Sequence, residues 1–417
     1  MEIPKELDVN LKAFPALSVS GYRSLIRRFP VTILLGLQQL GLVLVPALVY
    51  DNPHTKLLVS ITGLALFVSI TTEALLDVLK SGPRAATEIL PLKPIPVVPV
   101  WIFLGISLTI DTLSAIGGTR SYSVQLGSEA RAGWTVFLTP FSTWSLVATV
   151  MVLWLWKTRR IKPMTAIMAV LLVCFLKVGL GLTNGMVGSS AAFVLAIVIA
   201  ALWLELIRFR WFVIIVALGV GSWPKLAEYR NKLRSEVVGY SFDSTDPFSR
   251  LRLDEQMASV AVLMPRPAIL EPPSWLTVMR TGLVPSVLDS NRPPIDVGSR
   301  FSVALGGSAL NSTSATLLGN VVILTGWIGL AAFMVVIAAI LALLLRGRNV
   351  WFISFAAVVY LDGLSFSTTY PISVIRVLQS LESMLVMGTL FWLLSAVLAR
   401  TGRSTATRFG ASLERAV

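Results

Sequence analysis

Long apolar stretches alternate with short polar connections over most of the chain. An α-helix needs about 20 predominantly apolar residues to cross about 30 Å of hydrocarbon. By this criterion the pattern predicts about ten transmembrane helices, near residues 31-50, 57-76, 96-116, 135-156, 163-183, 187-207, 211-223, 316-345, 350-368 and 381-399. The stretch at 211-223 is short enough to be re-entrant, and the stretch at 316-345 is long enough to tilt or protrude. The pattern therefore predicts an all-α polytopic integral membrane protein.

Composition agrees with this prediction and changes the meaning of the charge. Of the 417 residues, 55% are hydrophobic and 14% are charged, and the mean hydropathy is +0.78, which lies outside the range of soluble domains. A net charge of +13 would indicate nucleic-acid binding in a soluble protein, but in a membrane protein basic residues report orientation. No nucleic-acid partner is expected. Because residues 1-30 are polar, no cleavable signal peptide is expected.

Lysine and arginine concentrate in every second connection between the predicted helices. The alternate short connections are nearly bare, with Lys56, Arg120, Arg131 and Arg376. The positive-inside rule therefore predicts that both termini lie in the cytoplasm, and an even number of helices agrees with this. The basic connections hold Arg23, Arg27, Arg28, Lys80, Lys93, Lys157, Arg159, Arg160, Lys162, Arg208, Arg210, Arg346, Arg348, Arg400, Arg403 and Arg408.

This orientation divides the chain into membrane and aqueous parts. Residues 117-134 and 369-380 are expected to be loops on the outer side, together with one long extracytoplasmic loop. The predicted parts are a cytoplasmic N-terminal segment at 1-30, transmembrane helices 1-7 at 31-223, the extracytoplasmic loop at 224-315, transmembrane helices 8-10 at 316-399 and a cytoplasmic tail at 400-417.

The long outer loop is rich in arginine. It contains only two lysines, and its arginines are interleaved with acidic residues. The eight arginines are Arg230, Arg234, Arg250, Arg252, Arg266, Arg280, Arg292 and Arg300. Arginine binds phosphate and carboxylate through two parallel hydrogen bonds, whereas lysine suffices for topology or solubility. The composition therefore favours a loop that binds anions. The alternative is a solvated cap held together by its own exposed ion pairs.

Three ionisable residues fall inside predicted helices at a shared depth, in the outer third of the membrane: Asp111, Lys177 and Asp362. Charges in this position are costly, so they are functional candidates. They predict a water-filled cavity open to the outside, and the alternative is a structural ion pair that joins the helices. Three further acidic residues near the cytoplasmic ends are expected to extend to the membrane interface: Glu73, Asp77 and Glu205.

The cysteine, the histidine and known catalytic motifs give little indication of function. Cys174 is the only cysteine and lies in an apolar stretch, so it is interpreted as an inert thiol. His54, the only histidine, is interpreted as incidental rather than as a general base. The chain has no phosphate-binding loop, nucleophile elbow, HExxH motif or Cys/His cluster. No metal or other cofactor is expected.

A series of motifs follows in order over about residues 184-345. They are a Gly- and Ser-rich turn before a helix pair, a basic turn with Arg208 and Arg210, a Tyr-Arg element at Tyr229-Arg230, an Arg-x-Asp element at Arg252 and Asp254, a proline-bearing segment from Val284 to Pro293, and a helix with Gly319, Gly326 and Gly329. In order and spacing this part of the chain resembles the bacterial oligosaccharide repeat-unit polymerases, the O-antigen polymerase or Wzy-like family. The chain departs from the family pattern at Ser286, where an arginine is usual after the proline.

The resemblance implies a metal-independent glycosyltransferase in the bacterial plasma (inner) membrane. Such enzymes transfer a growing glycan from polyprenyl diphosphate onto a new lipid-linked repeat unit at the outer face, and some systems include a chain-length regulator. For this reaction we hypothesise that Asp254 or Asp289 accepts the proton of the acceptor hydroxyl. Arg230, Arg252 and Arg292 are expected to contact the diphosphate, with Arg300 and Arg120 as second-rank candidates.

Other interpretations remain open. A related ligase would move the finished glycan to a different acceptor, although the ligases in question use a histidine in the long loop and this loop has none. A transporter or flippase of lipid-linked sugars and a non-catalytic scaffold are further alternatives. Arg252 and Asp254 can also form an ordinary local ion pair. The segment from Val284 to Gly298 is either an ordered cover over the cavity mouth or a plain connector.

Overall fold

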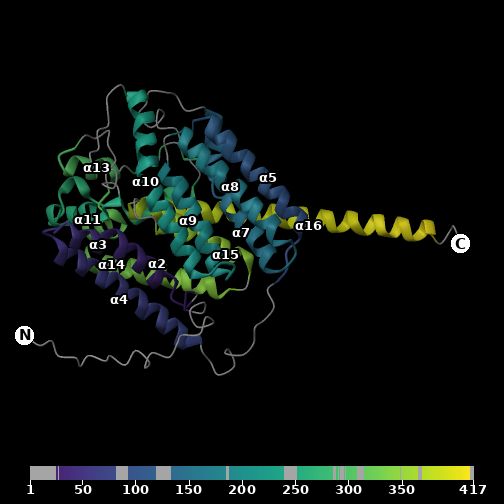
Figure 1. The fold of residues 1–417 in the computed structure, drawn as a ribbon, viewed down its shortest axis with the longest axis horizontal. Coiled ribbons are helices and arrows are strands. Elements are labelled where there is room, and N and C mark those ends of the chain that lie inside the picture. Colours follow the sequence, from purple (N-terminus) through teal and green to yellow (C-terminus); the bar gives the residue numbers. More distant parts are fainter. Residues whose placement is uncertain are drawn as a thin grey trace, which may run out of the picture.

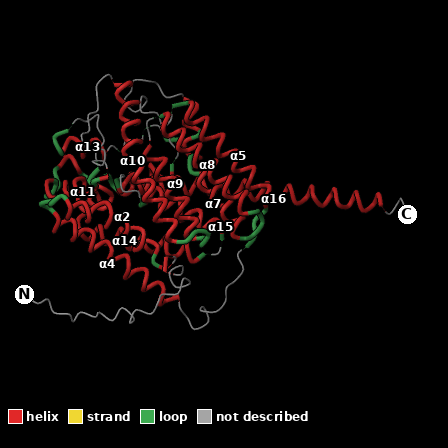
Figure 2. Tube along the Cα trace, viewed as in Figure 1, coloured by secondary structure: helices red, strands yellow, loops and turns green. Residues whose placement is uncertain are grey.

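The computed structural model describes residues 25-26, 28-80, 93-118, 133-184, 187-238, 251-284, 288-289, 291, 295, 297-307, 314-347, 349-364 and 369-413. These residues form helices and connecting loops without a strand (Figure 2). Figure 1 shows the helices gathered into one bundle, from which the end of the last helix projects towards the C-terminus.

The helices of the described residues follow the predicted apolar stretches. The first half contains α2 (Pro30–Gln39), the π-helical turn η2 (Leu40–Leu44), α3 (Val45–Val49), α4 (Thr55–Lys80), α5 (Val97–Ile116), the 3-10 turns η3 (Gly133–Phe137) and η4 (Thr139–Phe141), α7 (Trp144–Lys157), α8 (Pro163–Thr183) and α9 (Val187–Trp203). The second half contains α10 (Phe209–Val238), α11 (Leu253–Val262), the 3-10 turn η6 (Ala268–Leu270), α12 (Trp275–Leu283), α13 (Val297–Ala304), α14 (Thr316–Arg346), α15 (Val350–Val358), the π-helical turn η7 (Val359–Gly363) and α16 (Tyr370–Leu413).

Within the described residues, seven helices are long and apolar enough to cross a membrane, and three more are apolar but shorter. The short ones are Trp144–Lys157, Gly188–Trp203 and Val350–Gly363. The prediction of an all-helical, multi-pass membrane protein is thus confirmed. Of the ten predicted transmembrane helices, seven are long enough to cross a membrane within the described residues. The seven are Pro30–Val49, Thr55–Leu79, Val97–Ile116, Pro163–Thr183, Phe209–Leu233, Thr316–Arg346 and Tyr370–Arg400.

The short helix α7 forms the centre of the bundle. Every residue from Trp144 to Leu155 is buried, because α7 packs against α5, α8, α9 and α15. A helix surrounded by protein on all sides needs apolar residues around its whole circumference. This explains why the sequence of α7 has no distinct polar face. The helix is shorter than the stretch predicted at 135-156.

The predicted beginning of the last helix is wrong. Residues 369-380 were expected to form a loop, but α16 begins at Tyr370. Its residue Phe391 lies against Trp351, with ring centroids 5.6 Å apart, and Trp351 follows the basic connection that ends α14. The part from Tyr370 to Phe391 is about 33 Å long at 1.5 Å per residue, which matches the hydrocarbon thickness. The helix α16 therefore begins about ten residues before the predicted stretch, and its part from Tyr370 to Phe391 is by itself long enough to cross.

The helix α10, which corresponds to the stretch predicted at 211-223, also continues past its predicted end. The outer loop was expected to begin at residue 224, but α10 continues through Pro224 to Val238. The first half of α10 is apolar and largely exposed, as at Leu218, which is 68% exposed. It packs against α9. An apolar helix with little protein around it is suited to contact with lipid.

The helix α14 is broken near one end. Gly326 has φ +75° and ψ −174°, a backbone conformation that essentially only glycine adopts. The carbonyl of Leu324, next to the break, accepts a hydrogen bond of 2.8 Å from Arg266 Nη1. The part after the break, 327-346, has about the 20 residues that one crossing needs. The long stretch at 316-345 therefore consists of two helical parts that meet at Gly326, and whether it tilts or protrudes stays a prediction.

Glu73 corrects a further expectation. It was expected to extend to the interface, but it is completely buried. Its carboxylate accepts hydrogen bonds from Val31 N at 2.7 Å and from Thr32 N and Oγ1 at 3.2 and 2.6 Å. These donors lie in the first turn of α2, whose free N–H groups need acceptors. Glu73 therefore caps α2, while Arg346 donates to the carbonyl of Leu76 at the end of α4.

The E73A variant should unfold at a lower temperature than the parent. Removing the carboxylate leaves buried donors of α2 without acceptors, and we expect a loss of about 1–3 kcal/mol. The measurement is thermal unfolding of the purified protein by tryptophan fluorescence. The control is E205A, because the Glu205–Lys157 pair is 3.3 Å apart and each side chain is 31% exposed, so its loss should cost at most about 1 kcal/mol. Equal stabilities of E73A and E205A would contradict the capping role.

Candidate anion-binding site

The segment between α10 and α14 contains folded helices that pack on the membrane helices. The helix α11 packs against η2, α3, α4 and α14, and α12 packs against α16. The helix α13 packs against η6. This segment therefore has ordered contacts with the ends of several apolar helices, and its arginines lie close to those ends.

Arg252 is anchored by three neighbouring side chains. It precedes the first residue of α11, and its guanidinium lies 3.3 Å from Asp254 and 2.9 Å from Glu255. The guanidinium carbon is also 4.0 Å from the centroid of the Tyr50 ring, a favourable cation–π distance. Two carboxylates in the first turn also suit the positive end of the helix dipole. These contacts hold the Arg252 guanidinium in a defined orientation.

The charge of Arg252 is stable. Burial by itself lowers the pKa of Arg252, but the hydrogen bond and charge of Asp254 and the charge of Glu255 outweigh burial and raise the pKa above its ordinary value. The side chain is 19% exposed. Arg252 is therefore a permanent cation with limited access to solvent, which favours its use as an anion-binding group.

The turn between α3 and α4 takes part in the same cluster. Asn52 Nδ2 donates to Asp254 Oδ2 at 3.0 Å, and Asn52 Oδ1 accepts from His54 N at 3.0 Å. Asn52 thus links two segments that lie far apart in the sequence. Neither Tyr50 nor Asn52 was expected here, because only His54 in this turn carries recognisable chemistry. No local sequence signal reveals their contact with α11.

Asp254 is held inside the protein. Its side chain is completely buried, and its Oδ1 atom has no hydrogen-bond partner among the described residues. In this conformation an acceptor hydroxyl has no access to the carboxylate. The structure therefore favours a positioning role, in which Asp254 orients Arg252, and its use as a base would require the cluster to open.

The second candidate base, Asp289, is bound by an arginine. Arg280 donates from Nε to Asp289 Oδ2 and from Nη2 to Oδ1, both at 2.6 Å. The hydrogen bond and charge of Asp289 raise the pKa of Arg280. Both carboxylate oxygens therefore have a donor. Arg280, in α12, was not among the expected site residues.

The remaining arginine candidates have varied positions. Arg230 in α10 is buried and donates to Asn231 Oδ1 at 2.8 Å. Arg300 in α13 donates to the carbonyl of Glu271 at 3.3 Å. Arg120 and Arg292 lie outside the described residues. These contacts separate Arg230 and Arg300, which are held by neighbours of their own, from Arg252, which pairs with Asp254.

The structure brings two of the three intramembrane charges together. Lys177 Nζ of α8 lies 2.6 Å from Asp111 Oδ2 of α5, and each side chain is only 6% exposed. The Lys177 ammonium also lies 4.8 Å from the centroid of the Phe193 ring. Ser190 in α9 donates to the carbonyl of Lys177 at 2.8 Å. This close, buried pair favours the structural alternative, in which the charges join helices.

Asp362 contacts a different helix from the Lys177–Asp111 pair. It lies in η7 and accepts a 3.0 Å hydrogen bond from Ser380 Oγ of α16. The π-helical turn widens the helix locally at this position. A water-filled cavity between Asp362 and the Lys177–Asp111 pair stays a prediction.

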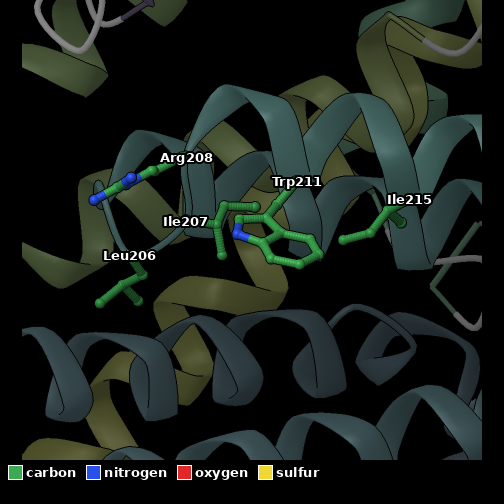
Figure 3. Close-up of a pocket in the computed structure, with 5 residues that line it drawn as sticks. All are labelled: Leu206, Ile207, Arg208, Trp211 and Ile215. Carbon is green, nitrogen blue, oxygen red and sulfur yellow. The ribbon is translucent and has the colours of Figure 1, made fainter. Parts of the chain in front are cut away.

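An open pocket lies at the turn between α9 and α10. It is lined by Leu206, Ile207, Arg208, Trp211 and Ile215 (Figure 3). Trp211 and Ile215 are four residues apart in α10 and therefore lie on one helical face, while Leu206, Ile207 and Arg208 come from the turn before α10. The pocket is mainly apolar and adjoins a connection predicted to be cytoplasmic. It is therefore separate in sequence from the arginines of the α10–α14 segment.

Among the residues that the structure describes, no three His, Cys, Asp or Glu side chains gather in a way that could hold a metal ion. The side chains in contact around Arg252 carry guanidinium, carboxylate and amide groups. These groups bind phosphate or carboxylate through charge-assisted hydrogen bonds.

Fold and site together define a multi-pass α-helical membrane protein with an arginine-bearing segment packed on the ends of its helices. Comparisons with protein-family models, with curated proteins and with solved structures find no match for the chain. The resemblance to oligosaccharide repeat-unit polymerases therefore stays a prediction.

Proposed function

We propose that the protein is a bacterial plasma-membrane glycosyltransferase of the oligosaccharide repeat-unit polymerase type. In this proposal both termini lie in the cytoplasm, and the α10–α14 segment faces outward. The substrates are two oligosaccharides linked to polyprenyl diphosphate. The enzyme transfers the growing glycan from its lipid carrier to the non-reducing end of a new lipid-linked unit.

The observation that carries the proposal is the anchoring of Arg252. Its guanidinium is held by Asp254, Glu255 and the Tyr50 ring at the junction of α11 with the turn between α3 and α4. A cation pre-organised in this way can stabilise negative charge that develops on a leaving group. A diphosphate on a membrane-bound lipid is such a leaving group, and it reaches the protein at the level of the helix ends.

The reaction needs one bond to break and one to form. A hydroxyl of the acceptor sugar attacks the anomeric carbon of the donor glycan, and the bond from this carbon to the diphosphate oxygen breaks. The hydroxyl proton passes to a carboxylate, and the electron pair of the broken bond remains on the lipid diphosphate. In the proposal Arg252 stabilises the diphosphate, with Arg230, Arg300, Arg292 and Arg120 as further candidates.

The proposed carboxylate is Asp254 or Asp289, and each is engaged in the present conformation. Asp254 is buried beside Arg252, and Asp289 accepts two hydrogen bonds from Arg280. Substrate diphosphate competes for the same guanidinium groups. Its binding would therefore release a carboxylate that can accept the proton.

Deletion of the gene should collapse the surface polysaccharide to single repeat units. The measurement is the length distribution of the polysaccharide on a gel, from cells with the wild-type gene, without the gene, and with the gene restored. A parallel assay determines on which membrane side the lipid-linked units accumulate. We expect loss of the ladder while single units still reach the outer face.

Two outcomes would overturn the proposal. Accumulation of lipid-linked units on the cytoplasmic side would identify a flippase. A normal length distribution with failure to attach the polymer to its final acceptor would identify a ligase. The control is a strain with R159A, because Arg159 lies in the turn after α7, far along the chain from the proposed site, and this strain should retain the full ladder.

A further inference from the structure

The helix α12 exposes an unusual amount of apolar surface for part of a loop. Trp275 and Leu276 are 61% and 79% exposed, and Met279 and Leu283 are 40% and 43% exposed. At helical spacing these four side chains form one continuous stripe. In water such a stripe would be unfavourable.

The opposite side of α12 is packed against α16. Its buried residues are Val278, Thr281 and Gly282. A Cβ atom on Gly282 would lie 2.7 Å from Leu378 Cδ1, so the two helices approach closely there. The Thr281 carbonyl accepts a hydrogen bond of 3.3 Å from Gln379 Nε2.

The two helices run in the same direction. At the beginning of α12 the ring of Trp275 lies 6.1 Å from the ring of Tyr370, and its end contacts Leu378 and Gln379. The helix α12 therefore follows the first ten or so residues of α16, over about 13 Å at 1.5 Å per residue.

Contacts of α16 give the depth of this part. Phe391 packs on Trp351 at the beginning of α15, and Ser380 donates to Asp362 at the end of the same apolar helix. Residues 370-379 of α16 thus extend past Asp362, away from the membrane side on which Phe391 and Trp351 lie. From Phe391 to Tyr370 the helix spans about the whole hydrocarbon thickness. The part of α16 next to α12, residues 370-379, consequently lies in the half of that thickness opposite to Phe391.

We propose that α12 lies within the membrane leaflet adjoining the α10–α14 segment, with Trp275, Leu276, Met279 and Leu283 against the acyl chains of phospholipids. The helix α16 also exposes apolar side chains beyond its contact with α12, including Leu385 at 65% exposure. Acyl chains fit both surfaces, whereas water fits neither.

Charge pairing agrees with this depth. Arg280 is the only basic residue of α12, and its two hydrogen bonds to Asp289 neutralise it. An unpaired arginine would be costly at the edge of the hydrocarbon, whereas a bidentate ion pair is tolerated. Arg376 in the neighbouring part of α16 is exposed, and its long side chain can reach the headgroup region.

The test uses single cysteines that carry an environment-sensitive fluorophore, in full-length protein in lipid nanodiscs. The background is C174A, which removes the native thiol. The probes are L276C and M279C on the stripe, with L385C as the lipid-facing control and E271C, in the loop before α12, as the aqueous control. The nanodiscs contain either ordinary or brominated phosphatidylcholine, and iodide is the aqueous quencher.

We expect brominated lipid to reduce the fluorescence at L276C and M279C about twofold, as at L385C, while iodide quenches only E271C. Quenching of L276C by iodide and not by lipid would place α12 in water. Protection from both quenchers would show that a protein surface covers the stripe. Either of these two results overturns the proposal, whatever reaction the protein catalyses.

Discussion

The K177M variant is expected to lose about 3–5 kcal/mol of unfolding free energy. The substitution leaves Asp111 buried at 6% exposure without the ammonium that lies 2.6 Å away in the parent. A carboxylate in an apolar interior without its partner is strongly unfavourable. The measurement is the midpoint of thermal unfolding of the detergent-solubilised protein, followed by tryptophan fluorescence.

The double variant K177M/D111L separates a structural role from a functional one. Replacing both charges by apolar side chains should restore most of the stability. If this variant also restores the polysaccharide ladder, the pair joins α5 and α8 and has no part in the reaction. If it is stable but inactive, the intramembrane charges belong to a functional cavity.

The matched control for this experiment is K157M. Lys157 also pairs with a carboxylate, that of Glu205, but both side chains are 31% exposed. We expect a change of at most about 1 kcal/mol, since water solvates the remaining charge. Equal destabilisation by K157M and K177M would mean that burial of the Lys177–Asp111 pair has no energetic consequence.

The R252A variant is expected to slow polymerisation by about 10²–10³-fold, the usual effect of removing one group that stabilises developing negative charge. The measurement is the rate of transfer between purified lipid-linked repeat units. Because R252A also leaves Asp254 buried without its cation, loss of folding would lower activity as well. A second variant is therefore needed.

The R252K variant keeps the charge next to Asp254 but loses the forked donor geometry and the planar stacking on Tyr50. We expect normal amounts of folded protein and a slower reaction. A full ladder from R252K with normal turnover would show that Arg252 only stabilises the cluster. The variant R159K, with a conservative change at an arginine outside the α10–α14 segment, should behave as the parent.

The sequence alone was sufficient to predict that this is an all-helical membrane protein and to locate its apolar helices along the chain. Hydrophobic runs are a local property of the chain, and every backbone polar group in a membrane must be satisfied within its helix. It was less reliable for helix ends. The beginning of α16 at Tyr370 is an example, because this part of α16 packs against α12 through the Tyr370 ring and Gln379, and no local pattern contains these contacts.

The candidate site shows the same division. The spacing of Arg252 and Asp254 is visible in the sequence, and so is the arginine content of the segment around them. Their partners Tyr50 and Asn52 are not visible, since about 200 positions separate these residues from Asp254. A turn residue gains this role only when α11 packs on the ends of α3 and α4.

Charged residues show most clearly what each level of structure decides. Sequence determined that Glu73, Asp111 and Lys177 lie in apolar helices, because their neighbours along the chain are apolar. Only the tertiary structure decided that Glu73 caps α2 and that Lys177 pairs with Asp111. The physical reason is that the free energy of a buried charge depends on groups within a few ångströms in space, and packing of distant helices brings those groups together.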